Sequence, residues 1–148
     1  MLTGRQLTGL TVRDSASGKK VGRICDIFAD VRSGQVRGYA VAGDTLLSRA
    51  MLLPASAVES VGLGGVIADA SALKRLHAGN DNVSAWRGAV LRSSAGRDLG
   101  VIADVIVSDG RVAALEISGG LWSDVAQRRS LVAWDSVRVD ADGCFIRN

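Results

Sequence analysis

A chain of 148 residues can form one ordinary domain or two very small ones, and 47% hydrophobic with only 22% charged residues excludes a disordered protein. The net charge of +3 is mild, with arginine more frequent than lysine and aspartate more frequent than glutamate. Because aspartate and the 18 glycines suit turns better than helices, the composition favours an all-β fold.

Few residues are available for metal, redox or membrane chemistry. His77 is the only histidine, and Cys25 and Cys144 lie far apart, without the spacing of a zinc site, which needs about four ligands. Two isolated thiols form no disulfide framework, and we expect both to be small buried side chains in a reducing compartment. The N-terminus lacks the layout of a signal peptide, and no apolar run approaches the ~20 residues of a membrane span. We expect a cytoplasmic protein with no metal, no cofactor and no membrane insertion.

Taken in order, the chain repeats itself. The segment SGKKVGRICDIFAD at 17–30 returns as AGRDLGVIADVIVS at 95–108. Three further blocks return in the same order, at offsets between 76 and 79: 9–14 as 88–93, 33–43 as 109–119, and 52–67 as 131–146. A duplicated unit of about 70 residues explains this pattern. We therefore divide the chain into repeat 1 (1–70), a linker (71–85) and repeat 2 (86–148).

Each repeat is a series of short strands separated by turn residues, which is typical of a small antiparallel sheet or barrel. A long strand is predicted at 20–30 and again at 98–108. Gly22 and Gly100 lie near its start, where a glycine indicates a bulge or a sharp bend that closes a short sheet on itself. Strict alternation along 98–108 would place Ile102 and Asp104 on one face, and Val105 on the other.

Two acids occur at matching places within these long strands. Asp26 and Asp104 each lie among apolar neighbours, where a carboxylate can have a shifted pKa and act in a site. Because both copies keep the acid, we favour a fold-determining role for it beside Gly22 and Gly100. The carboxylate would then accept backbone N–H bonds at the bend next to the strand glycine.

The linker is predicted to begin with a short helix. Asp69 or Ser71 can cap it, it would run through Leu76, and Gly79 can end it. His77 would lie at its C-terminus, where the helix dipole favours a histidine. No partner for a Ser-His or Cys-His mechanism is visible in the sequence, so we expect no enzyme activity.

Two loops at equivalent places are candidates for a partner contact. The loops 43–51 and 119–130 carry an aromatic or leucines beside arginines, and both residue types are enriched at interface hot spots. The alternative is that they fold over the ends of the sheets and complete the core. The candidate residues are Leu46, Leu47, Arg49, Trp122, Arg128 and Arg129.

A second candidate surface is basic. Lys19, Lys20 and Arg23 fall close together in repeat 1 and could contact RNA through its phosphates. With aromatics at 4% of the chain, few side chains can stack on bases, so a solvated sheet surface is the alternative.

With these blocks laid out, the sequence resembles the PRC-barrel family. The matches follow a pattern of glycines, apolar positions and one aspartate that both repeats keep: Gly9, Val12, Gly18, Val21, Gly22, Ile24, Asp26 and Ile27, then Gly88, Leu91, Gly96, Leu99, Gly100, Ile102, Asp104 and Val105. The segment that ends the family pattern is matched in part at 53–58 and at 132–137.

The resemblance implies two small antiparallel β-barrels in tandem, joined by the short linker helix and packed as a pseudo-two-fold pair, as in tandem PRC-barrel proteins of bacteria. In this family the module is a binding platform with no shared catalytic residues. We therefore expect a non-catalytic adaptor that recognises a protein partner. The alternative is an RNA- or ribosome-associated protein that uses the basic first repeat, and the apolar content leaves self-association open.

Overall fold

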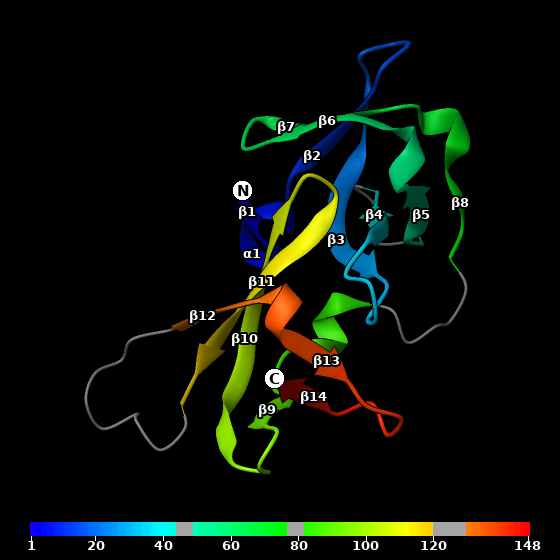
Figure 1. Ribbon diagram of the computed structural model, residues 1–148. Coiled ribbons are helices and arrows are strands. Elements are labelled where there is room, and N and C mark those ends of the chain that lie inside the picture. The colour runs from blue at the N-terminus through cyan, green and yellow to red at the C-terminus, as the bar shows by residue number, and fades with distance from the viewer. Residues whose placement is uncertain (44–48, 77–81, 120–129) are drawn as a thin grey trace.

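The structure is a computed structural model that describes residues 1–43, 49–76, 82–119 and 130–148 (Figure 1). It contains two seven-stranded sheets, the first formed mainly by repeat 1 and the second mainly by repeat 2. The first sheet has the order β6-β7-β2-β3-β4-β5-β8; the second has the order β12-β11-β10-β9-β14-β13, with β1 paired to β10. The predicted all-β, duplicated architecture is confirmed.

The elements have the following bounds. The first sheet consists of β2 (Thr11–Asp14), β3 (Lys20–Ala29), β4 (Val36–Ala42), β5 (Met51–Pro54), β6 (Val58–Gly62), β7 (Gly65–Ala68) and β8 (Lys74–Arg75). The second consists of β1 (Leu2–Thr3), β9 (Val90–Ser93), β10 (Asp98–Ser108), β11 (Arg111–Ser118), β12 (Ser130–Ala133), β13 (Val137–Val139) and β14 (Phe145–Arg147). The short helical segments are α1 (Gly4–Leu7) and the 3₁₀ turns η1 (Ala55–Ala57), η2 (Ala70–Ala72), η3 (Val83–Trp86) and η5 (Trp134–Ser136).

The predicted irregularity at the strand glycines is present in both copies. Gly22 lies opposite Val12 and Gly100 lies opposite Leu91, and each glycine is next to a shift in register. A Cβ at Gly100 would lie 2.7 Å from the carbonyl oxygen of Ser118, and one at Gly22 would meet the equivalent carbonyl of Ala42. Glycine is needed because the neighbouring strand comes too close for a side chain.

A second irregularity in the long strands changes which residues face the core. The register shifts between Ile24 and Asp26, and between Ile102 and Asp104. Past this bulge the alternation changes phase, so Ile102 and Val105 are both buried. The strict alternation expected along 98–108 is therefore wrong beyond Ile102.

The segment that leads into each repeat packs on the other repeat. Strand β1 pairs with β10, with Leu2 opposite Val107 and Thr3 opposite Ile106. The equivalent Asn82, just before η3, forms a bridge with Phe28 in β3. Because α1 and η3 follow directly, each short helix lies against the opposite sheet (Figure 1).

The tips of the two long hairpins meet where the repeats exchange equivalent hydrogen bonds. The N–H of Val36 donates to the carbonyl of Gly110 at 2.9 Å, and the N–H of Val112 donates to that of Gly34 at 2.7 Å. Gln35 and Arg111, which are equivalent residues, form a bridge with each other. A local pseudo-two-fold axis therefore passes between these two residues.

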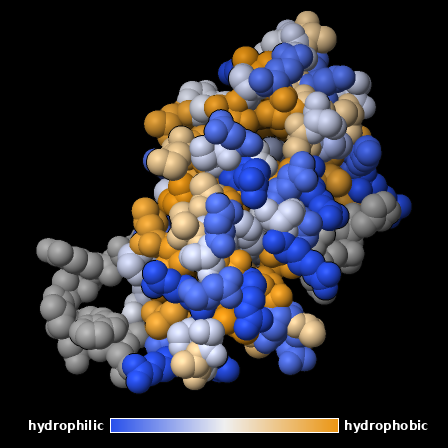
Figure 2. Space-filling view, in the orientation of Figure 1, coloured by the Kyte–Doolittle hydropathy of each residue, from blue (hydrophilic) through white to orange (hydrophobic). Residues whose placement is uncertain are grey.

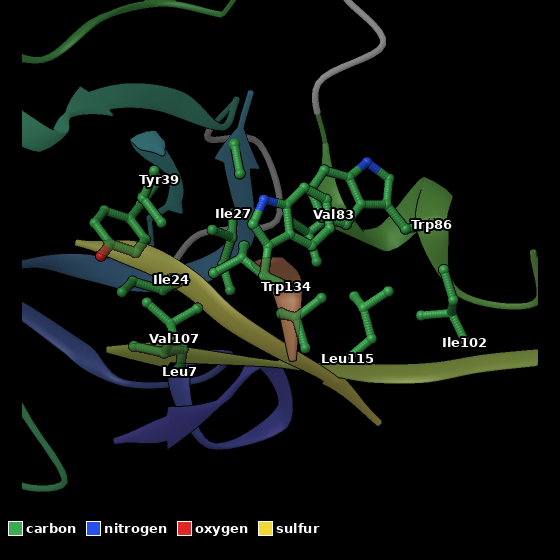
Figure 3. Close-up of a cluster of buried hydrophobic side chains, with 14 of the residues drawn as sticks. Leu7, Ile24, Ile27, Tyr39, Val83, Trp86, Ile102, Val107, Leu115 and Trp134 are labelled. Atoms are coloured by element: carbon green, nitrogen blue, oxygen red, sulfur yellow. The ribbon is translucent and has the colours of Figure 1, made fainter. Parts of the chain in front are cut away.

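Buried side chains from both repeats form one continuous cluster (Figure 3). Leu7, Ile24 and Leu53 come from repeat 1, whereas Leu91 and Leu115 come from repeat 2. A unit of this size buries only about 60% of the surface of its unfolded chain. The shared core therefore supplements the burial that either repeat could reach alone.

Three expectations need correction or remain open. The predicted linker helix is a single 3₁₀ turn, in which Asp69 accepts from the N–H of Ser71, and the chain then extends as β8 along β5. His77 and Gly79 lie outside the described residues. Cys25 and Cys144 are exposed, so the expectation of buried thiols is wrong.

Strand pairing within the described ranges leaves each sheet as an open path, from β6 to β8 and from β12 to β13. Within those same ranges, no helix has the length and apolar character needed to cross a membrane.

Candidate binding cleft between the repeats

Five of the six residues predicted for the loop contacts lie outside the described residues: Leu46, Leu47, Trp122, Arg128 and Arg129. Arg49 is described and exposed.

The predicted basic residues lie on the β2–β3 hairpin. Lys19, Lys20 and Arg23 are all exposed. The Nη1 of Arg23 lies 3.4 Å from the carbonyl oxygen of Gly9, to which it donates. Arg13, on the same hairpin, donates in the same way to the carbonyl of Gly18 at 3.3 Å. The two arginines thus make local hydrogen bonds to the backbone and also contribute positive charge to this surface.

Asp104 occupies the junction between the N-terminal segment and repeat 2. Its side chain is 1% exposed. Oδ2 accepts from the backbone N–H of Arg5 at 3.1 Å, and Oδ1 accepts from Nη2 of Arg87 at 3.2 Å and from the N–H of Val105 at 2.8 Å. Gly4 is packed so closely that a Cβ there would collide with this carboxylate. The buried charge is thereby both paired and hydrogen-bonded, as burial requires.

Asp26 in repeat 1 makes the equivalent contact to the segment that leads into repeat 2. Its carboxylate accepts from Oγ of Ser84 at 2.7 Å, from the N–H of Ser84 at 3.4 Å and from the N–H of Ile27 at 2.8 Å. Ser84 lies in η3, which leads into repeat 2. Each aspartate therefore binds the lead-in segment of the other repeat, and the predicted donors beside the strand glycine are not the ones observed. The second bulge turns both side chains toward that segment.

A cleft of about 480 Å³ opens where the two repeats meet. Its volume is within the range of small-molecule and side-chain pockets. Strand β6 and the hairpin tip between β10 and β11 form opposite walls, and Figure 1 shows the yellow tip lying below the β6–β7 hairpin. The lining residues are Met1, Leu2, Leu7, Val36, Tyr39, Ala55, Val58, Glu59, Ser60, Val61, Val107, Ser108, Asp109 and Gly110.

The lining of this cleft combines apolar side chains with polar and charged groups. Leu7, Val36 and Tyr39 are almost completely buried, whereas Glu59 and Asp109 are exposed. Burial raises the pKa of the Tyr39 phenol, so this hydroxyl stays protonated at neutral pH and can act as a donor. The arrangement suits an apolar group that enters from solvent and is oriented by a few polar atoms.

A shallower groove of about 330 Å³ lies along the β6–β7 hairpin. Val61, Leu63 and Ile67 are exposed there, and Figure 2 shows apolar residues gathered on this hairpin. Val61 lines both hollows, so the exposed apolar surface continues from the groove to the cleft.

The ranges that the structure describes contain no side-chain cluster of the kind that binds a metal ion. No cluster of three or more His, Cys, Asp or Glu side chains capable of holding a metal occurs there. Sequence reasoning missed the cleft because its residues come from four separate segments. The signal that could have indicated it is a difference between the copies, since Ala55 occupies the place that Trp134 holds in repeat 2.

The comparison with family models agrees with this duplicated fold. The model of the PRC-barrel domain matches twice, at residues 1–75 and 81–148. The chain belongs to the PRC-barrel family. The predicted resemblance is confirmed, and the two PRC-barrel matches together span nearly the whole chain. A search of the curated proteins found no match to it.

Proposed function

We propose that this tandem PRC-barrel protein is a non-catalytic adaptor whose inter-repeat cleft recognises a protein partner. The observation that carries the proposal is the solvent-open cleft of about 480 Å³, which has both apolar and polar lining residues and to which both repeats contribute a wall. Apolar pockets with a polar rim are where interface hot spots concentrate.

The scaffold around the cleft supports this function because contacts between the two repeats fix their relative position. The lead-in segments are exchanged between the repeats, and the hairpin tips bond to each other through Val36 and Gly110. A preorganised site loses less entropy when it binds. An adaptor of this kind would present the cleft in one conformation.

Two finer features belong to the same proposal. Each sheet would close into a small barrel, with η1 and η5 turning the chain from one sheet edge toward the other. The loops 43–51 and 119–130 would add contacts beyond the cleft. Because the seven-residue strand β4 begins at the hairpin tip with Val36 and ends at Ala42, the first loop leaves from the far end of the sheet. The cleft, by contrast, combines residues of both repeats, which is why we place recognition there.

The proposal is tested by site-specific photo-cross-linking in cells. A photoreactive residue replaces Ser60, which lines the cleft, and in a control chain it replaces Ser94, which is exposed on the β9–β10 hairpin. We expect a distinct protein to be captured from position 60 and not from position 94. Equal capture at both positions, or capture only of a second copy of this chain, would refute the adaptor proposal.

The same experiment separates the RNA alternative. If RNA bridges the complex, ribonuclease treatment abolishes the cross-link. Combined neutral substitution of Lys19, Lys20 and Arg23 would then weaken the association and reduce its salt dependence. An adaptor that acts through the cleft keeps its cross-link under both conditions.

A further inference from the structure

The two repeats create two equivalent places for a cleft, and only one of them is filled by the chain. The first lies between the β4–β6 part of repeat 1 and the hairpin tip of repeat 2, where the cleft is open. The equivalent place lies between the β11–β13 part of repeat 2 and the hairpin tip of repeat 1. The offsets between 76 and 79 residues relate the lining residues to their equivalents in the other repeat.

Aromatic rings fill the second place (Figure 3). Trp134 stacks on Trp86 with ring centroids 5.5 Å apart. Phe145 packs against Trp86 with ring centroids 5.8 Å apart. The Trp134 indole also covers Gly34 at the hairpin tip, where a Cβ would lie 2.5 Å from the indole nitrogen. Both tryptophans are about 95% buried, with 5% and 4% of their surface exposed.

The open cleft lacks these rings at the corresponding positions. Leu7 replaces Trp86, Ala55 replaces Trp134, and Val66 replaces Phe145. The equivalent of Gly34 is Gly110, which has nearly the same φ of 74°. Among the residues that the structure describes, no atom lies within 4 Å of a Cβ placed at Gly110, so none of them covers Gly110 as the Trp134 indole covers Gly34.

From this internal comparison we propose that the open cleft receives an aromatic side chain of the tryptophan type from the protein partner. The proposal rests on the adaptor function above and names the chemistry of what the partner inserts. A ring seated over Gly110 would repeat the packing that Trp134 makes over Gly34. Aromatic rings supply large apolar contact at small entropic cost, which is why they act as anchors.

The cleft differs from its filled counterpart in one further position that shapes the occupant. Tyr39 in β4 stands where Leu115 stands in β11, so a mostly buried aromatic residue lies at the base of the open cleft. An incoming ring can contact only the small part of Tyr39 that is exposed there. The protonated Tyr39 hydroxyl offers a hydrogen bond to a backbone carbonyl beside that ring.

Charge on the rim indicates what flanks the aromatic residue. Glu59 and Asp109 both line the cleft and are exposed, and none of the described residues that line it is a lysine or an arginine. The rim is therefore negative overall. Lysine or arginine next to the inserted ring would complement it, and acidic neighbours would be repelled.

The test uses the full chain and short peptides as probes. Amide chemical shifts are followed by NMR during titration with the pentapeptide GKWKG, and with GKLKG, GKAKG and GEWEG for comparison. We expect GKWKG to shift the amides of Val107 and Gly110 and to bind about tenfold more tightly than GKLKG. No binding of GKWKG, or equal binding of GKLKG, would overturn the aromatic assignment; equal binding of GEWEG would overturn the basic flank.

Matched variants tie the binding to the cleft. Ala55→Trp places in repeat 1 the ring that repeat 2 carries, and should abolish the GKWKG shifts. Ser56→Trp adds the same ring at the next, exposed residue, which does not line the cleft, and should leave them unchanged. If Ala55→Trp does not fold, Ala55→Phe serves as a smaller filler. Undiminished peptide binding in a folded, filled variant would overturn the proposal.

The two proposals fail in different ways. If a protein cross-links to position 60 in the wild type and still does so in Ala55→Trp, the adaptor function stands and the aromatic anchor is wrong. If the peptide binds as expected but no protein is captured from position 60, the adaptor function is wrong while the chemistry of the cleft holds.

Discussion

Substitution of Asp104 tests whether the exchanged lead-in segments hold the two repeats together. Asp104→Ala removes the acceptor for the N–H of Arg5 and for Nη2 of Arg87. Hydrogen bonds to a charged group contribute about 1.5–3 kcal/mol each. The lower end applies, because the side chain of Arg87 is 37% exposed and regains water. We therefore expect a loss of about 3 kcal/mol in the free energy of unfolding, or about 10 °C in Tm for a chain of this size.

The equivalent acid of repeat 1 provides the matched control. Asp26 is only half-buried, and its donor Ser84 is exposed and can turn to solvent. Asp26→Ala should cost about 1 kcal/mol. Urea denaturation and calorimetry give both values, and hydrogen exchange of the Arg5 amide reports directly on the docked N-terminal segment. An Asp26 variant as unstable as the Asp104 variant, or unchanged exchange at Arg5, would refute this account of the junction.

Three further outcomes are expected. Gly100→Ala should lower the free energy of unfolding by about 2–3 kcal/mol in urea denaturation, because the φ of Gly100 is 126° and a strand carbonyl lies 2.7 Å from the new Cβ. Gly96→Ala, also at positive φ but with no described atom within 4 Å of the new Cβ, should cost about 1 kcal/mol, and equal losses in the two variants would contradict this. Although Cys25 as a residue is exposed, its sulfur is partly desolvated beside the carbonyl of Ala40, and this desolvation, followed by the charge of Asp26, raises the pKa of the thiol. With Cys144 replaced by serine, the protein should therefore react with a thiol reagent at pH 8 more slowly than a free thiol does, and an equal rate would count against this. A hydrogen bond from the N–H of Ala70, followed by one from the Ser17 side chain, lowers the pKa of Asp14 below 3.8, so the stabilisation that Asp14 provides is present above that pH and is lost as the pH falls through the lowered pKa. Asp14→Asn should therefore reduce the fall in the free energy of unfolding at acid pH, and an unaltered pH dependence would refute this role of Asp14.

Several features were predictable because short-range chemistry decides them. The duplication can be read directly, and a glycine within an apolar strand has few explanations other than a close backbone or a bulge. Gly22 and Gly100 accordingly have matching surroundings. The second bulge was not predictable, because Cys25 and Ala103 carry no signal that distinguishes a bulged residue from an ordinary strand residue.

The linker shows how tertiary contacts override local preference. Asp69 does cap a turn, as predicted, yet the chain then extends as β8 instead of continuing as a helix. The edge of β5 offers backbone partners to an extended segment, and pairing with it satisfies the linker's polar groups better than an isolated short helix would.

The sequence alone determined that two copies of one β-module exist, where their turns and strand glycines lie, and that both copies keep an acid in the long strand. Only the tertiary structure decided that these acids bind across the repeats, and that one of the two equivalent clefts stays open. The reason is that equivalent residues are chemically alike in a duplicated chain. A contact such as that of Asp104 with the N-terminal segment, or of Asp26 with Ser84, has the same local signature whether it forms within a repeat or between repeats.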